Sequence, residues 1–399
     1  MASGRAERDA MGSLPLTTEQ IRVRRAERRA QVRRRRATVL VVAAGLVALG
    51  VGILAGRGET GGTNRVQTPT AESTRSQPAR TTVSAPQSRL GNGKPVTLAF
   101  GGDIHFETPI RERLAADPAS VLASIAPVLR RADVAVVNLE TAVTDRSSRV
   151  AKEYTFRAPA SAFEALKAGG VDVASVANNH GMDFGVSGLR DTLAAANRAN
   201  VRVIGAGIDD RQAYAPDRVT IDGQRLAIIG ATQVLDDHLI DAWSASPGDP
   251  GLASAKNVTR LVRAVRDARA TSDTVVVFLH WGAELETCPT PRQRRLARTL
   301  ASAGADVIVG AHAHVILGAG RLGSAFVAYG LGNLVFYASR EATSQTGVLE
   351  VTVTGRRVDG YRFVPARISG GLPYPLAGSE RTSAIADWRA LRRCTGLRP

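Results

Sequence analysis

The segment 176–185 reads VANNHGMDFG, and in it an apolar, strand-like run gives way at once to polar side chains. Two carboxamides, an imidazole and a carboxylate follow the run, in Asn178, Asn179, His180 and Asp183. A segment that only turns needs Gly, Asn or Asp, but it does not need a histidine. How this segment is interpreted therefore depends on where the other histidines lie.

The chain around this segment alternates apolar runs with helical patterns, which predicts an α/β domain with covered sheets. After residue 320 the pattern changes to strands joined by turns, in AFVAYG, VLEVTVTG and RRVDGYRFVPARI, which predicts a second, more antiparallel sheet. The predicted strands cover 96–100, 134–138, 171–177, 201–206, 225–232, 274–280 and 306–312, and the predicted helices cover 120–131, 162–170, 186–200, about 255–270 and about 291–303.

Five of the six histidines stand just beyond the carboxyl end of a predicted strand. A further strand, VAVVN, ends at Asn138 and leads to Glu140. In open α/β sheets the crevice outside the carboxyl ends of the strands is where ligands bind. The pattern therefore predicts one convergent site, and only His238 is interpreted as a loop histidine. The five histidines are His105, His180, His280, His312 and His314.

The residue types at these strand ends indicate a metal site. Asp, Glu, Asn and His without Cys form an oxygen and nitrogen ligand set that suits Mn, Fe, Zn or Mg. Two x-spaced pairs, Asp103-x-His105 and His312-x-His314, can each serve a pair of neighbouring ions that activates a nucleophile. Each motif taken alone also has a structural interpretation, as a turn, a helix cap or an incidental His-x-His.

The N-terminal quarter has a different composition. Residues 1–36 hold eleven arginines and four acidic residues, and residues 37–56 form a run of 20 residues without a charge. A run of this length matches the bilayer core and predicts a transmembrane anchor, with the basic tail in the cytoplasm and the rest of the chain outside. A cleaved signal peptide is the alternative. Residues 57–95 are rich in Thr, Ser, Gln, Pro and Gly, which predicts a disordered extracytoplasmic linker.

The net charge of +16 is concentrated in the tail and the linker, and residues 96–399 carry only +5 of it. The composition therefore does not indicate a nucleic-acid groove, and no nucleic-acid partner is expected. The basic tail fits the anionic headgroups of a membrane instead. The two cysteines, Cys288 and Cys394, either pair in an oxidising compartment or stay as free thiols, and the sequence leaves both possibilities open.

Six short motifs occur in one order along the chain: GGDIHFE, VVNLETAVT, VANNHGMDFG, FLHWGAE, VIVGAHAHV and YGLGNLVF. With them the chain resembles the capsule-synthesis protein CapA family, also described as poly-γ-glutamate biosynthesis proteins. That family is similar to calcineurin-like metallophosphatases. The resemblance implies an α/β, four-layer αββα sandwich with two facing mixed sheets over residues 96–370, preceded by one transmembrane helix and followed by a C-terminal tail at 371–399.

The resemblance also implies which residues hold two divalent metal ions. Asp103, His105 and His314 would hold one ion, and Asn179, His280 and His312 the other. Glu140 would bridge them, although it stands in NLE where the metallophosphatases have an aspartate in GDxxD. His180 would protonate the leaving group or steady the transition state. The catalytic group further includes Asn178 and Asp183, and the residues that would orient the imidazoles are Asn138, Glu284 and Asn333.

The function implied by the resemblance is metal-dependent hydrolysis or transfer in the production of capsule, poly-γ-glutamate or another cell-surface polymer. The expected partners are the membrane, through the single anchor, and an anionic surface polymer or its synthase complex. Two alternatives stay open. One is a metallophosphoesterase acting on a phosphate ester of the envelope, and the other is an assembly factor without catalytic activity.

Overall fold

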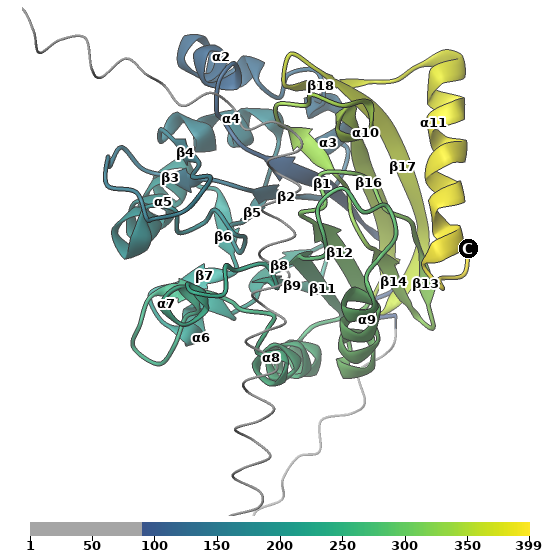
Figure 1. Ribbon diagram of the computed structural model, residues 1–399. Helices are drawn as coiled ribbons and strands as arrows, with labels where there is room; N and C mark the ends of the chain where they lie inside the picture. Colours follow the sequence, from purple (N-terminus) through teal and green to yellow (C-terminus); the bar gives the residue numbers. More distant parts are fainter. Residues whose placement is uncertain (1–89) are drawn as a thin grey trace, which may run out of the picture. The chain divides into compact units, whose positions relative to one another are not determined.

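The computed structural model describes residues 90–399, and Figure 1 shows their strands gathered into two large sheets. The basic tail, the transmembrane span predicted at 37–56 and the linker up to residue 89 lie outside the described residues, so all three remain predictions. Within residues 90–399, no helix combines the length and the hydrophobicity that crossing a bilayer requires.

The larger sheet has eight strands and mixes parallel with antiparallel pairing. Its first half is parallel, with β1 paired to β2, β2 to β5 and β5 to β6. On the other side of β1, the strands β16, β17 and β18 run antiparallel, and β15 pairs with the end of β1. In spatial order the strands are β18 (Leu372–Pro375), β17 (Arg357–Ser369), β16 (Gln345–Thr354), β1 (Val96–Ile104), β2 (Val134–Leu139), β5 (Val173–Ser175) and β6 (Arg202–Ile204), with β15 (Asn333–Val335) beside β1.

The smaller sheet has six strands with a parallel centre and antiparallel edges. Two short strand pairs lie apart from both sheets. In spatial order the smaller sheet comprises β13 (Ala319–Leu322), β14 (Ala325–Ala328), β12 (Val307–Ala311), β11 (Thr274–His280), β9 (Gln224–Thr232) and β8 (Asp217–Ile221). The short pairs are β3 (Ala142–Val143) with β4 (Arg157–Ala158) and β7 (Ala206–Gly207) with β10 (Gly251–Leu252).

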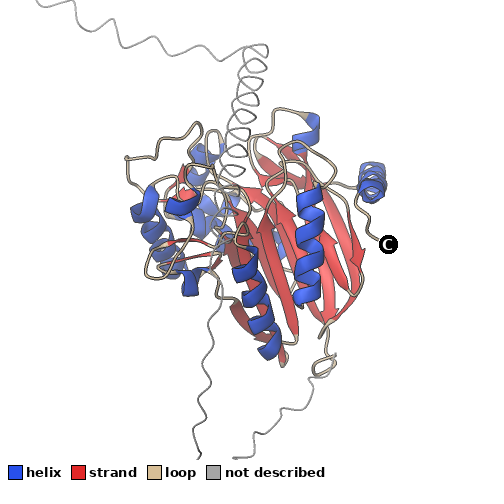
Figure 2. Ribbon diagram, turned by 60° about the horizontal axis from the view of Figure 1, so that its bottom comes forward, coloured by secondary structure: helices blue, strands red, loops and turns tan. Residues whose placement is uncertain are grey.

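Helices lie on the outer sides of the two sheets, as Figure 2 shows. The larger sheet is covered by α2 (Ile110–Ala116), η1 (Pro118–Ser120), α3 (Ala126–Leu129), α4 (Ser161–Gly169) and α5 (Gly185–Ala199). The smaller sheet is covered by α8 (Val258–Thr271) and α9 (Pro291–Ala303). The remaining helices are α6 (Asp210–Ala213), α7 (Ile240–Trp243), α10 (Glu341–Ser344), α11 (Gly378–Ala390) and η2 (Leu391–Cys394).

Three hydrophobic cores lie between these layers, and strand β11 contributes side chains to two of them. Its side chains are buried on both faces, and successive residues point in opposite directions. Val275 and Val277 belong to the core shared with α8 and α9, whereas Phe278 belongs to the core between the sheets. There the ring of Phe278 lies 6.4 Å from that of Phe100 on β1. The layers are therefore helix, sheet, sheet and helix, and the predicted mixed α/β architecture is confirmed.

Two expectations about individual elements were wrong. The late strands do not form a sheet of their own, because β16 pairs with β1 and extends the larger sheet, while β14 joins the smaller sheet beside β12. Short turns between strands predict antiparallel pairing, but they do not predict which earlier strand has a free edge where a later strand can pair. The helix expected at 120–131 shrinks to α3, since Pro127 is tolerated only in a first turn and the helix begins beside it.

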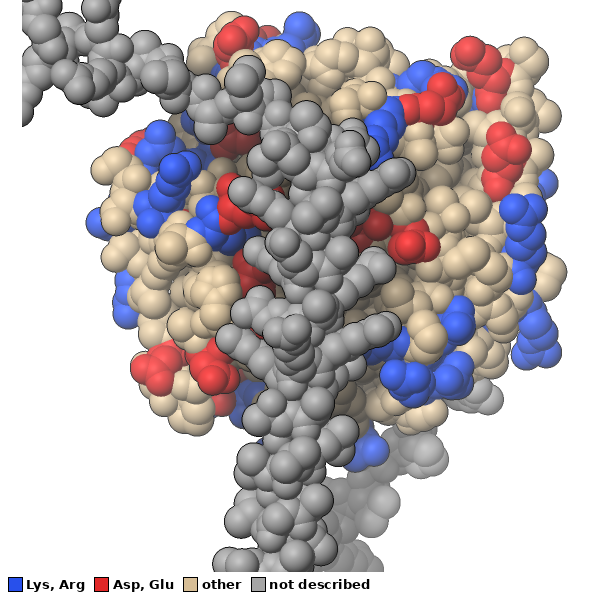
Figure 3. Space-filling view, viewed as in Figure 1, with Lys and Arg blue, Asp and Glu red and all other residues tan. Residues whose placement is uncertain are grey.

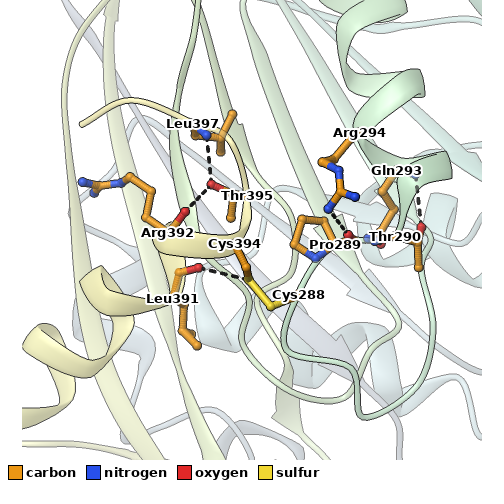
Figure 4. Close-up of a disulfide and its surroundings, with 10 residues drawn as sticks. All are labelled: Cys288, Pro289, Thr290, Gln293, Arg294, Leu391, Arg392, Cys394, Thr395 and Leu397. Atoms are coloured by element: carbon orange, nitrogen blue, oxygen red, sulfur yellow. Dashed lines mark hydrogen bonds between the residues drawn. A yellow bond between two sulfur atoms is a disulfide. The ribbon is translucent and has the colours of Figure 1, made fainter.

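Residues 371–399, treated as a tail in the sequence, pack against the domain through β18, α11 and η2. Trp388 on α11 stacks on Phe363 of β17 with ring centroids 4.9 Å apart. Cys394 forms a disulfide with Cys288 across a Cα–Cα distance of 5.7 Å (Figure 4). This bond joins the C-terminal segment to the loop that follows His280, and it settles the pairing that the sequence left open.

Candidate metal centre

The carboxyl ends of strands from both sheets meet at one place. In the larger sheet Asp103 stands beside Asn138 on β2 and beside Asn333 on β15. In the smaller sheet His280 is the last residue of β11, and it pairs with Ala311, the last residue of β12. The Asp103 backbone N–H donates to Gly332 over 2.9 Å. This close approach requires Gly102, because a Cβ there would lie 1.9 Å from the Gly332 carbonyl oxygen.

The histidines after β12 adopt backbone conformations that are rare outside glycine. The φ angle is 98° at His312 and 57° at His314. Because residues 312–314 are no longer extended, the rule that alternate strand residues share one face does not set their side-chain directions. Here the turn brings both imidazoles to one cluster with Glu140. Strained conformations of this kind concentrate at functional sites.

Two overlapping groups of side chains have the spacing of metal ligands. One comprises Asp103, Glu140 and His280, and the other comprises Glu140, His312 and His314. In each group the candidate ligand atoms lie within 4.8 Å of one another. Glu140 belongs to both groups. Its two carboxylate oxygens are buried and have no hydrogen-bond partner within the described residues, and the same holds for Nδ1 of His312.

These unpartnered atoms show that the cluster fits divalent ions. Buried carboxylate oxygens without a partner are costly, since most buried polar atoms are hydrogen-bonded. A bound cation would satisfy them, and imidazole with carboxylate is a common donor set for Mn, Fe and Zn. The position of Glu140 between both groups suits a bridging ligand, the role expected from the sequence.

The two groups differ in part from the expected scheme. The groups join Asp103 with His280 and His312 with His314. Nδ1 of His314 also lies 3.3 Å from Oδ2 of Asp103, however, as the expected scheme requires. Asn179 lies at the cluster, with its Oδ1 2.7 Å from Nε2 of His280. These side chains thus lie together, and their assignment as ligands of two ions stays a prediction.

His105 lies beside the cluster and belongs to neither ligand group. Its Nε2 accepts the backbone N–H of Tyr337 over 3.1 Å, and its ring stacks on Phe336 with centroids 3.8 Å apart. Its Nδ1 is buried without a partner among the described residues. As the side chains stand, His105 packs within an aromatic wall. Because Nε2 accepts a hydrogen bond, the neutral imidazole carries its proton on Nδ1, and neither nitrogen presents a free lone pair to an ion.

Carboxamides hold the ligands in place. Asn138 Nδ2 lies 2.8 Å from Oδ1 of Asp103 and 3.1 Å from Nδ1 of His280. Asn333 Oδ1 lies 2.9 Å from Nδ1 of His314. Partners of this kind fix the orientation of ligating imidazoles. Of the residues expected to orient imidazoles, only Glu284 makes no such hydrogen bond among the described residues, and its side chain is exposed.

His180 is oriented by neighbours from its own segment. Its Nδ1 lies 2.6 Å from Oδ2 of Asp183, and its backbone N–H donates to Oδ1 of Asn178 over 2.9 Å. Asn178 in turn donates to Leu139, next to Glu140, over 2.8 Å. Within the described residues Nε2 of His180 makes no hydrogen bond. The segment that opened the sequence analysis therefore places one ring nitrogen against a carboxylate and leaves the other free.

Lys152 is a site residue that the sequence did not reveal. It lies in the long connection between β3 and β4, yet its side chain is only 7% exposed. Its Nζ lies 2.8 Å from Oδ1 of Asp183 and 3.4 Å from Nδ1 of His180, and it also donates to the carbonyl oxygen of Asn179. Its sequence context, RVAKEYTF, has no apolar period that would indicate burial.

Burial controls the protonation of the cluster. It lowers the pKa of His280 well below the usual value and that of His312 to about 3, so both imidazoles are neutral and ready to bind a cation. Burial, with Asp103 nearby, raises the pKa of Glu140 well above its usual value. For His314, burial lowers the pKa, but Glu140 and Asp103 outweigh it and raise the pKa to about 10.

The pKa of His180 is lowered by burial, while its hydrogen bond to Asp183 acts in the opposite direction. Phe156 stacks on the His180 ring with centroids 3.9 Å apart, which excludes water from one face of the imidazole. The result is a largely neutral histidine held against a carboxylate, as a proton-transferring group requires near neutral pH.

Comparison with known proteins agrees with these observations. The model of a family described as bacterial capsule synthesis protein PGA_cap matches residues 97–338. The capsule biosynthesis protein CapA of Bacillus anthracis is 29% identical over 323 residues, which are 79% of this chain and 76% of that protein. The PGA biosynthesis protein CapA of Bacillus subtilis is 28% identical over 299 residues, which are 73% of this chain and 76% of that protein.

Among solved structures, a 5'-nucleotidase from Candida albicans aligns with a TM-score of 0.39 at 11% identity. The alignment covers 74% of this chain and 58% of that one.

Proposed function

The chain belongs to the bacterial capsule synthesis protein PGA_cap family, and from this premise we propose that it is a membrane-anchored, extracytoplasmic enzyme of cell-surface polymer production. Its reaction is metal-dependent hydrolysis or group transfer on a capsular chain such as poly-γ-glutamate. The proposal rests above all on Glu140, which is buried, has no hydrogen-bond partner among the described residues and is shared by two ligand groups.

Asp103, Glu140 and His280 would hold one divalent ion, and Glu140, His312 and His314 the other. Ions bound there polarise a carbonyl or phosphoryl oxygen and lower the pKa of a bound water. Asn138 keeps Asp103 and His280 aligned through its bonds to both.

His180 would move the proton. With Nδ1 held by Asp183, its free Nε2 can give a proton to a leaving group or take one from water. Lys152 contacts Oδ1 of Asp183, the oxygen that His180 does not contact, and its ammonium group lies beside the His180–Asp183 pair. An anionic substrate would be favoured by that charge.

The disulfide supports the extracytoplasmic location. Disulfides persist in oxidising compartments and are rare in the cytosol. The only two cysteines of the chain are joined, as Cys288 and Cys394, although they are 106 residues apart in sequence. This agrees with the orientation predicted from the arginine-rich tail before residue 37.

Elemental analysis of the purified full chain tests the proposal, beside a variant that carries Asn179→Ala and His312→Ala. We expect stoichiometric Mn, Fe or Zn in the parent protein and its loss in the variant. Equal metal content in both would overturn the ligand assignment. Absence of metal from the parent protein, with no thermal stabilisation by added Mn²⁺ or Zn²⁺, would favour an assembly factor instead.

The reaction is tested separately, by incubating the metal-loaded protein with γ-glutamyl peptides and with phosphodiester model compounds. Cleavage of γ-glutamyl peptides that the double variant loses supports the proposal. Cleavage of phosphodiesters alone would replace it with a metallophosphoesterase.

A further inference from the structure

The helices α8 and α9 have the same relation to the smaller sheet. Leu261 and Val265 of α8 and Leu296 and Leu300 of α9 belong to one hydrophobic core with β11. Because both helices bury their apolar sides against the same face of one sheet, their opposite sides point outward together. The two helices also contact each other. They form a single outer surface in front of the smaller sheet (Figure 1).

That outer surface is dominated by arginine. Residues Pro291–Ala303 of α9 contain four arginines and no acidic residue, and α8 contains four arginines and one acidic residue, Asp267. In Figure 3, Lys and Arg side chains gather in the lower part of the visible face, where Figure 1 places α9. The exposed arginines form what we name the arginine face, which comprises Arg263, Arg266, Arg292, Arg295 and Arg298.

No member of the arginine face forms an ion pair or side-chain hydrogen bond within the described residues. Two other arginines of α8 do form ion pairs. Arg260 lies 2.7 Å from Asp210, and Arg269 lies 2.5 Å from Asp306. The domain therefore supplies carboxylates to the partly buried arginines and leaves the outer ones without counter-charges.

The arginine face begins at the edge where the metal centre lies. Strand β11 ends at His280, and α9 starts at Pro291 after one connecting loop and returns along the sheet. Arg292 therefore stands at the site end of the helix. Arg295 and Arg298 follow at intervals of three residues, about 4.5 Å each along the axis. The three guanidinium groups of α9 therefore follow one another away from the metal centre.

We propose that the arginine face binds an extended polyanion, a chain of carboxylates such as a polyglutamate, and holds it beside the metal centre. The inference rests on the proposed function for the identity of the polymer, but not for the existence of the surface. Charge complementarity carries it, because a linear polyanion meets several guanidinium groups at once. This surface binds the polymer at a distance from the bond that reacts.

An anionic membrane surface is the other partner that a basic face can meet. Helices that lie on membranes present apolar side chains beside their basic ones. The leucines of α8 and α9 and Val265 are instead buried in the protein core, and Val262 is partly buried. Val258, at the first position of α8, is the one large apolar side chain of the two helices that is exposed, at 38%. The observations therefore favour a soluble polyanion.

Binding of fluorescent poly-L-glutamate to the full-length protein in detergent tests the proposal, with salt varied. The test variant carries Arg292→Gln, Arg295→Gln and Arg298→Gln. A matched control carries Arg381→Gln, Arg389→Gln and Arg393→Gln, which removes the same charge from α11 and η2. All six positions are exposed, so both variants should fold, and circular dichroism with thermal unfolding verifies it.

We expect the α9 variant to bind about tenfold more weakly at low salt, and the slope of log affinity against log salt to fall by roughly 2. The α11 variant should bind within about twofold of the parent protein, since its charges lie outside the row. Equal losses in both variants would overturn the proposal, because net charge alone would then explain binding. Loss of binding to phosphatidylglycerol vesicles, with polyglutamate binding unchanged, would overturn it in favour of a membrane surface.

The same assay separates this inference from the proposed function. If no polymer is cleaved while the α9 variant alone loses binding, the surface stands and the proposed reaction fails.

Discussion

Replacing Glu140 by Gln separates two contributions of this residue, one to stability and one to metal binding. Glu140 is fully buried, and neither of its oxygens has a hydrogen-bond partner in the described part of the chain, although Oε1 lies 3.5 Å from Nε2 of the neutral His280. Burial raises its pKa, and a carboxyl whose pKa is higher in the folded than in the unfolded chain lowers folding stability once the pH exceeds the unfolded value. The neutral amide removes that penalty.

The magnitude follows from the contacts. Relief of a buried, unpartnered polar group is worth about 1–3 kcal/mol. Part of this is offset because Glu140 attracts the protonated His314. We therefore expect the free energy of unfolding of the metal-free protein at pH 8 to stay unchanged or rise by up to about 2 kcal/mol. The metal-bound protein should lose about 2.7 kcal/mol of stabilisation at Mn²⁺ 100 times above the dissociation constant.

Urea unfolding with and without Mn²⁺ measures both effects. A matched control is Glu350→Gln, because Glu350 is also buried but lies on β16 and pairs with Arg131 at 3.1 Å and Arg362 at 2.5 Å. The control should lower the stability of the metal-free protein by about 1–3 kcal/mol and keep the full Mn²⁺ effect. If Glu140→Gln behaves like the control in both measurements, Glu140 is not a metal ligand and the reasoning fails.

Three further predictions follow from the structure. Lys152→Met should lower the free energy of unfolding by about 3 kcal/mol in urea titrations, because it leaves the charge of Asp183 buried without its cation. Mn²⁺ affinity should rise about tenfold per pH unit between about pH 6 and 9, since the pKa of His314 is about 10 in the metal-free protein and its proton must leave when an ion binds; calorimetry should detect about one proton released. Replacing Cys288 and Cys394 by serine should lower the free energy of unfolding by about 3–5 kcal/mol, and dithiothreitol should do the same to the parent protein only.

Each of these predictions has an outcome that contradicts it. The double variant Lys152→Met with Asp183→Asn should recover part of the loss, and a larger loss would mean that Lys152 stabilises by packing. An Mn²⁺ affinity that is constant with pH would place His314 outside the ligand set. Sensitivity of the serine variant to dithiothreitol would show that the reductant acts on something other than the disulfide.

The residues of the site were largely foreseeable from the sequence because strand ends are local features. Asp103, Glu140, His280 and His312 each follow an apolar run that is readable as a strand. The carboxyl ends of strands in such sheets are where ligands bind, so the order of residues was sufficient to predict that they converge. Asn138 was predictable for the same reason, because it ends a predicted strand, whereas Asn333 was implied only by the family resemblance.

The contacts of Lys152 and His105 were not foreseeable, because they depend on segments that are distant in sequence. Lys152 is buried where it meets Asp183, 31 residues later, and the ring of Trp243, more than 90 residues later. His105 is enclosed by Phe336 and Tyr337, more than 200 residues later, and its Nε2 is taken by a backbone N–H there. No periodicity within either segment reports such a contact.

The amino-acid sequence alone determined the α/β alternation, the polar set at the strand ends and the family motifs, since all of these depend on neighbours along the chain. The tertiary structure decided which side chains share a candidate ligand group, that the two cysteines pair, and that the arginines of α8 and α9 share one outer surface. These depend on how two sheets face each other and on left-handed turns at His312 and His314. Packing over long sequence separations sets both, and it leaves no local pattern to read.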